Sequence, residues 1–199
     1  MGDSDEGGVA LVIVMMTMTL LTALGTVLAL ATITETAIAA NYRDAAEAFY
    51  AAEGGVEFVM QEIAGIPDWS DVLAESGRSA FVDGPASGVR TVGAVTLDLQ
   101  QATREVDAFA PGGVGGPWVL HAFGPFTDLL PPGSSRSPIY VAVWIADRSE
   151  MPGDGMSGPD ALSVLAQGFG ARGSRRTVEA VVDRADASTV RTRSWREIR

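Results

Sequence analysis

The stretch that decides the fold is Gly8–Thr34, which reads GVALVIVMMTMTLLTALGTVLALATIT and contains no charged side chain. An α-helix rises about 1.5 Å per residue, so about 20 apolar residues cross the hydrocarbon of a bilayer. The preceding MGDSDEGG has acidic residues and no basic one. A secretory signal peptide begins with basic residues, has a shorter apolar core and ends in a small-x-small cleavage site. The sequence therefore predicts a membrane anchor that is retained.

The segment that follows, Glu35–Ala64, is rich in Ala and Glu and has no proline. Its apolar residues recur mostly in steps of three and four, which is the spacing of an amphipathic helix. They are Ile38, Tyr42, Phe49, Ala52, Val56, Val59 and Ile63, while Asn41, Asp44, Glu47 and Glu57 lie at other angles. We expect the first set to pack on the rest of the protein and the second to face water.

No residue at the junction of these two segments stops a helix. The sequence therefore predicts one continuous helix from about Val9 to about Ala64, ended by Gly65 and Pro67. Gly25 and the pair Gly54–Gly55 are its expected weak points, because glycine in a helix costs about 1 kcal/mol relative to alanine.

The remaining residues, 65–199, predict a β-rich head. Pro138–Ala146 alternates, with Ile139, Val141, Val143 and Ile145 on one face and Tyr140 and Trp144 on the other. Apolar residues on both faces indicate a central strand with one face against the amphipathic helix. Further expected strands are 90–99, 118–123, 161–167, 177–183 and 189–198, and 68–75 is an expected short helix. The predicted fold class is α+β, with a long helix packed on an antiparallel sheet.

The amino-acid composition limits the classes of function that the chain can have. The chain has no cysteine, which excludes disulfides and thiol chemistry. Its net charge is −11, yet residues 172–199 hold eight arginines and four acids. Such a basic end on an acidic body indicates either electrostatic docking between subunits or a solvated last strand. No P-loop, GxGxxG, GxSxG or HExxH motif is present, so we expect no enzyme and no catalytic residue. Nothing in the sequence points to nucleic acid as a partner.

Two features were weighed as metal or proton-transfer sites. The acidic loop that contains Asp147, Asp154 and Asp160 offers the oxygen ligands that Ca²⁺ prefers, but it does not fit the EF-hand spacing. We interpret it as a solvated hairpin loop and keep the three aspartates as weak Ca²⁺ candidates, with no other metal and no cofactor expected. His121 is the only histidine, and without cysteine or a second histidine it is better interpreted as a strand residue.

Three motifs together resemble a known family. They are GVALVI at Gly8–Ile13, ANYRDAAEAFYAAEGGVE at Ala40–Glu57, and SRRTVEAVVDR at Ser174–Arg184. The chain resembles type IV pilins and pseudopilins, and most closely the minor pilins of the PilX class. The resemblance implies a prepilin leader at residues 1–8, a transmembrane and filament-core helix half at 9–34, an amphipathic half at 35–64 and a globular head at 65–199.

The resemblance also assigns roles to single residues. Gly8 matches the residue before the prepilin peptidase cut and Val9 the first mature residue, with Gly7 as an alternative cut site. The fifth mature residue of major pilins is a glutamate, and here it is Ile13, which argues against a major subunit. Glu35, near the end of the apolar run, is a candidate for pairing with a neighbouring subunit or marks the membrane boundary.

The function implied is a minor pilin-like structural subunit of a bacterial type IV pilus or related filament, which promotes assembly or caps the tip, with a role in cell adhesion. Its implied partners are other pilin and minor pilin subunits, the prepilin peptidase, the inner-membrane assembly platform and membrane lipid. The protein would be a single-pass protein of the cytoplasmic membrane with its head outside the cytosol, and later part of the pilus at the cell surface.

Two alternatives remain open from the sequence. One is a type II secretion tip pseudopilin, which also lacks the glutamate at the fifth mature position but usually has a larger head. The other is an unprocessed single-pass membrane protein whose β-domain binds a ligand or partner. N-terminal processing separates the second alternative from both filament readings.

Overall fold

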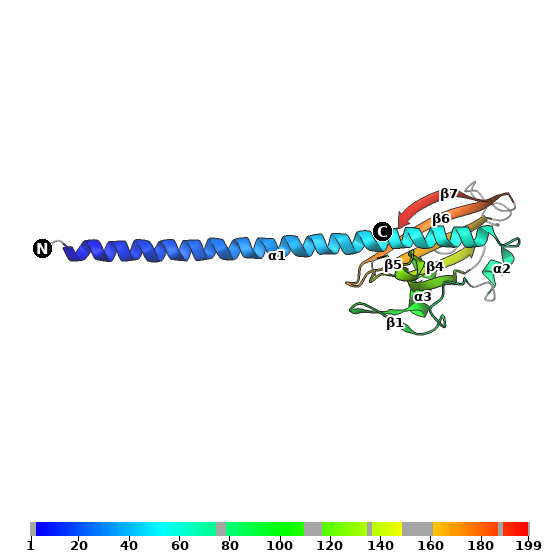
Figure 1. Cartoon of the computed structure of the whole chain (residues 1–199), viewed down its shortest axis with the longest axis horizontal. Coiled ribbons are helices and arrows are strands. Elements are labelled where there is room, and N and C mark those ends of the chain that lie inside the picture. The colour runs from blue at the N-terminus through cyan, green and yellow to red at the C-terminus, as the bar shows by residue number, and fades with distance from the viewer. Residues whose placement is uncertain are drawn as a thin grey trace. The chain divides into compact units, whose positions relative to one another are not determined.

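The computed structural model describes residues 3–74, 79–109, 117–134, 137–148, 161–186 and 189–198, with residues 3–7 as backbone only. The chain divides into two compact units, Met1–Tyr42 and Arg43–Arg199. Helix α1, Asp3–Ala64, belongs to both units (Figure 1). It begins before the expected Val9: the leader contains no proline, and its acidic residues favour a helix N-terminus even though Gly7 and Gly8 are poor helix formers. Its C-terminal end at Ala64 is confirmed.

The head contains one five-stranded antiparallel sheet in the order β3-β4-β5-β6-β7 (Figure 1). The strands are β3 (Val119–Pro125), β4 (Tyr140–Asp147), β5 (Ala161–Phe169), β6 (Arg175–Asp186) and β7 (Thr189–Ile198). Each strand pairs with the next one in the chain, as consecutive strands commonly do. The expected α+β class and the predicted strands of this sheet are confirmed.

The segment before the sheet differs from expectation. Residues 90–99 were expected to form one strand, but they belong to a hairpin, β1 (Val89–Val92) and β2 (Val95–Asp98). The hairpin turns at Gly93, whose φ of 59° suits glycine. Helix α3 (Leu99–Phe109) follows, and sequence analysis missed it. Two short helices are α2 (Ser70–Leu73), shorter than the expected 68–75, and η2 (Phe126–Leu129).

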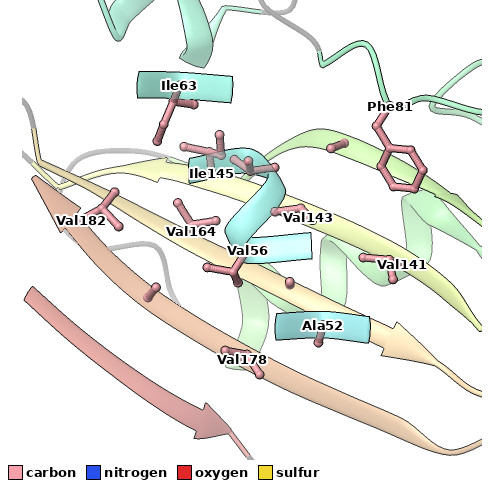
Figure 2. Close-up of a cluster of buried hydrophobic side chains, with 14 of the residues drawn as sticks. Ala52, Val56, Ile63, Phe81, Val141, Val143, Ile145, Val164, Val178 and Val182 are labelled. Atoms are coloured by element: carbon pink, nitrogen blue, oxygen red, sulfur yellow. The ribbon is translucent and has the colours of Figure 1, made fainter. Parts of the chain in front are cut away.

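Strand β4 separates two hydrophobic cores, as its alternating sequence predicted. On one face Val141, Val143 and Ile145 pack with Val56 and Ile63 of α1 (Figure 2). On the other face Tyr140 and Trp144 pack with Leu99 and Val106 of α3. The Trp144 Nε1–H donates a hydrogen bond to Thr103 Oγ1 of α3 at 2.9 Å, which satisfies the indole inside this second core.

Small residues let the backbone of α1 approach the sheet closely. Ala48, Ala51 and Ala52 are fully buried on this face of the helix. A Cβ added to Gly55 would lie 2.7 Å from Val141 Cγ1, and one added to Gly168 of β5 would collide with the Ala48 carbonyl oxygen. Gly55 therefore permits this contact. Glycine lowers the helix propensity at this position, and the tight packing against the sheet offsets that cost.

The contact face of α1 is not the whole face that the sequence predicted. Ile38 and Tyr42 are 63% and 78% exposed, and Phe49 is only partly buried. Asp44, expected on the solvated side, is buried and accepts a hydrogen bond from Ser174 Oγ at 2.5 Å. Ser174 belongs to the loop between β5 and β6. The buried aspartate therefore links the beginning of the packed half of α1 to this loop.

Candidate functional site

The N-terminal half of α1 presents an exposed apolar surface. Its large apolar side chains between Val9 and Ile33 are 51–69% exposed. Its most hydrophobic window has mean hydropathy 2.2 and none of that window is buried. By length and composition this is the one described helix suited to crossing a membrane. The segment therefore has to find its apolar surroundings outside its own chain.

The threonines of this half are compatible with an apolar environment. The hydroxyl of each donates a hydrogen bond of 2.8–3.0 Å to the backbone carbonyl four residues earlier. They are Thr17, Thr19, Thr22, Thr26, Thr32 and Thr34, and Thr36 at the start of the following half makes the same bond. Because every one of these hydroxyl protons is satisfied within the helix, the surface enters lipid or a helix bundle without needing partners for them.

Gly8 and Val9, the expected processing positions, both lie on α1, and both residues are exposed. No atom lies within 4 Å of a Cβ built on Gly8. A side chain larger than glycine would therefore fit at position 8, and the Gly8–Val9 peptide bond itself lies within α1. The cut itself stays a prediction.

Ile13 and Glu35 lie 22 positions apart on α1, both with exposed side chains. Ile13 is 58% exposed, and Glu35 is exposed and has no hydrogen bond or ion pair with any described residue. Neither side chain contributes to the cores of the head. Their expected role in subunit packing stays a prediction, which now concerns contacts outside the chain.

The weak Ca²⁺ candidates are placed only in part. Asp147 is the last residue of β4 and is paired in register with Leu162, whereas Asp154 and Asp160 lie outside the described residues. Within the described ranges, no three His, Cys, Asp or Glu side chains come close enough to hold a metal ion. Ca²⁺ binding by this loop stays a prediction.

His121 is a buried residue of β3, in agreement with its interpretation as a strand residue. It lies at the β-bulge between Leu120 and Ala122, and its Nε2 is 3.1 Å from Glu62 Oε2 of α1. The other carboxylate oxygen of Glu62 accepts a hydrogen bond from the Ala80 N–H at 3.0 Å. Glu62 thus connects the end of α1 both to the sheet and to the segment of residues 79–83.

The protonation of Glu62 is tied to these contacts. Burial acts to raise the pKa of this carboxyl, but hydrogen bonds from His121, from Ser79 and from the Ala80 N–H outweigh it, so the pKa is lowered. Sequence analysis did not single out Glu62. Its position between the apolar Val59 and Ile63 was the available signal, because a glutamate next to two contact-face residues lies at the margin of the buried face.

The basic C-terminal end is largely neutralised within the head. Arg191 and Arg193 of β7 contact Asp183 of β6 at 2.7 Å and 2.6 Å, and Arg196 contacts Glu179 at 2.5 Å. These hydrogen bonds, led by the one from Arg191, outweigh the effect of burial and lower the pKa of Asp183 to about 2. Ion pairs with β6 therefore stabilise the last strand. The arginines in these pairs are already neutralised, so they add little positive charge for docking.

The comparisons with known proteins concern the N-terminal part. Residues 7–57 match the family model described as PilX N-terminal. The match spans the apolar half of α1 and most of its packed half, and it is consistent with a type IV pilin of the PilX class. No curated protein and no solved structure matches the chain.

Proposed function

We propose that the chain is a minor pilin-like structural subunit of a type IV pilus or related filament, and that it has no catalytic activity. The observation that carries the proposal is the division of one helix into an uncovered apolar half and a half packed on an antiparallel sheet. The match of residues 7–57 to the PilX N-terminal model supports it.

Assembly would exchange one apolar environment for another. Before assembly the apolar half of α1 would lie in the cytoplasmic membrane, with the head outside the cytosol. After the leader is removed at Gly8, the same half would join the helices of neighbouring subunits. Since lipid tails and apolar helices are equally hydrophobic, hydrophobic burial changes little, and packing supplies the preference for the filament.

The proposed partners follow from this cycle. They are other pilin and minor pilin subunits, the prepilin peptidase, the inner-membrane assembly platform, and lipid before assembly. Ile13 stands where a major pilin has glutamate, so a charge thought to align incoming subunits is missing. We therefore assign this chain to initiation or capping of the filament, and its final location to the pilus at the cell surface.

N-terminal processing tests the proposal. We expect protein from cells with an active prepilin peptidase to begin at Val9, or at Gly8 if the cut falls one residue earlier, as measured by N-terminal sequencing. Gly8→Trp should leave the leader attached, whereas Gly25→Trp, at a second glycine with open space around it, should be processed normally. Retention of the leader on the unaltered chain would contradict the pilin assignment and favour an unprocessed single-pass protein.

Abundance tests the minor role. Quantitative mass spectrometry of sheared filaments should find the chain as a small minority beside a main subunit. If it were as abundant as the main subunit, it would be a builder of the filament and not an initiator or cap. Neighbouring genes for other minor pilins or for a secretion operon would separate a pilus from a type II secretion system.

A further inference from the structure

A groove of about 250 Å³ lies on the head where α1 passes beside the last strand of the sheet. It is lined by Glu53, Gly54, Val56, Glu57 and Met60 of α1, Ala180 of β6, and Thr192 and Trp195 of β7. Trp195 is 46% exposed, and Phe49 holds it by an edge-to-face contact at 5.9 Å between ring centroids. The groove is therefore lined by a solvent-accessible indole that also contacts α1.

Two glutamates of α1, Glu53 and Glu57, also line the groove. Neither has a hydrogen bond or ion pair with any described residue. They stand four residues apart on the helix, a spacing at which like charges repel each other. By contrast, Glu62, Asp183 and Glu179 all have partners. The groove thus holds negative charge that the described chain leaves uncompensated.

The register of β7 explains why its arginines do not neutralise these glutamates. Trp195 is paired with Ala180, whose side chain belongs to the core under α1. Arg196 is paired with Glu179, and Arg191 with Asp183, on the opposite face of the sheet. Side chains alternate between faces, and the bulge in β7 between its pairings with Val181 and Val182 shifts this alternation by one residue, so Trp195 lies on the groove face while Arg191 and Arg196 lie on the other. Among the described residues, no arginine forms an ion pair with either glutamate of the groove, so the groove has room for a cation from another subunit.

We propose that this groove binds an arginine side chain of a neighbouring filament subunit. An indole face attracts a guanidinium through the cation–π interaction, and carboxylates accept its planar N–H donors in charge-assisted hydrogen bonds. Two unpaired glutamates beside an exposed tryptophan match both properties of that one group. The inference rests on the proposed function for the identity of the partner, whereas its chemistry rests on the groove alone.

The chemistry is tested on the full chain in detergent. The four tryptophans are Trp69, Trp118, Trp144 and Trp195, of which the first three are buried. With 5-fluorotryptophan incorporated, ¹⁹F NMR gives separate signals, and Trp195→Phe identifies that of Trp195. We expect N-acetylarginine methylamide to shift this signal at about tenfold lower concentration than the neutral N-acetylcitrulline methylamide.

Two variants decide the outcome of this titration. Glu53→Gln with Glu57→Gln should remove the preference for arginine, and because it relieves a like-charge pair it should not lower the melting temperature. Asp71→Asn with Asp128→Asn removes two exposed acids away from the groove and should leave the preference intact. Equal shifts from arginine and citrulline, or an undiminished preference in the glutamine variant, would overturn the inference.

The partner is tested in filaments. A photo-crosslinking residue at Thr192, on the rim of the groove, should form a crosslink to an arginine-containing peptide of another filament subunit, and the yield should fall at least about fivefold in the glutamine variant. Crosslinks confined to peptides without arginine would refute the inference while leaving the proposed function standing. Absence of the processed chain from filaments would instead refute the proposed function, and the NMR titration would still decide the chemistry of the groove.

Discussion

The two halves of α1 have the same backbone and opposite surroundings. Between Val9 and Ile33 the large apolar side chains are 51–69% exposed, whereas Val59 and Ile63 in the packed half are fully buried. The first half is apolar on all sides, and its threonine hydroxyls are satisfied internally. The second half has one narrow face of alanine and glycine that fits its own sheet. A helix that is apolar on all sides requires lipid or other helices around it. A helix with a single apolar face can bury that face against the rest of its own chain.

This comparison separates the energetic roles of the halves. Substitutions in the packed half should change the stability of the head, because its contacts form when the head folds. The same substitutions in the apolar half should change assembly or membrane insertion and leave the unfolding of the head alone. Matched pairs of residues within the one helix make the comparison measurable.

The largest expected difference is between two isoleucines. Ile63→Ala removes a fully buried side chain and should lower the free energy of unfolding of the head by about 2–5 kcal/mol. Ile33→Ala makes the same change at a 65% exposed position and should leave that free energy within about 0.5 kcal/mol of its original value. Chemical denaturation of the full chain in detergent, followed by near-ultraviolet circular dichroism, measures both. Equal effects would mean that the packed half does not belong to the core of the head.

Acid should destabilise the head through carboxylates with lowered pKa values. The pKa of Asp183 is lowered to about 2 by Arg191 and Arg193, and that of Glu62 is also lowered. The folded head then binds fewer protons than the unfolded chain, so the stabilisation is complete above about pH 4.5 and is lost as the pH falls towards 2. We expect the melting temperature to fall over this range.

Asp183→Asn should lower the melting temperature at neutral pH and weaken its dependence on acid, because the carboxylate that titrates is gone. Asp71→Asn removes an exposed aspartate without a partner among the described residues and should leave the acid profile unchanged. If the profile of Asp183→Asn matched that of the unaltered chain, the ion pairs between β6 and β7 would not stabilise the head. Differential scanning fluorimetry between pH 2 and pH 7 makes the measurement.

A smaller difference is expected between two glycines of α1. Gly55→Ala places a Cβ 2.7 Å from Val141 Cγ1, and overpacking of this kind costs about 1–3 kcal/mol. Alanine also regains about 1 kcal/mol of helix propensity, so the net loss of stability should be about 1 kcal/mol. Gly25→Ala meets no atom within 4 Å and should not destabilise the head. Thermal unfolding that shows Gly55→Ala to be stabilising would contradict the close packing of α1 on the sheet.

The sequence predicted those parts of the fold whose periodicity is local. Alternating Ile and Val in 139–145 identified the central strand and its two faces, and the spacing of Val56, Val59 and Ile63 identified the packed face of the helix. Helix α3 was missed because its buried residues, Leu99, Ala102 and Val106, form a short pattern among polar neighbours. The Asp98 cap, which accepts hydrogen bonds from two backbone N–H groups of α3, was a signal that was overlooked.

Other features depend on contacts that are distant in the sequence. The burial of Asp44 requires the β5–β6 turn to bring Ser174 to it, and no local pattern contains that information. The groove at Trp195 likewise requires the register of β7 on β6. For Gly8, Val9 and Ile13 the assignment still rests on family resemblance, and for Glu35 on its place near the end of the apolar run, because no contact within the described chain tests these roles.

The most direct measurement compares crosslinking from the two halves of α1 in assembled filaments. A benzoylphenylalanine at Leu24, which is 58% exposed in the apolar half, should crosslink to other subunits. The same residue at Phe58, which packs edge-to-face on Phe81 in the head, should crosslink only within its own chain. Mass spectrometry of the crosslinked peptides distinguishes the two. Crosslinks from Leu24 to its own chain alone, in filaments that contain the protein, would contradict the assignment of the apolar half to the filament core.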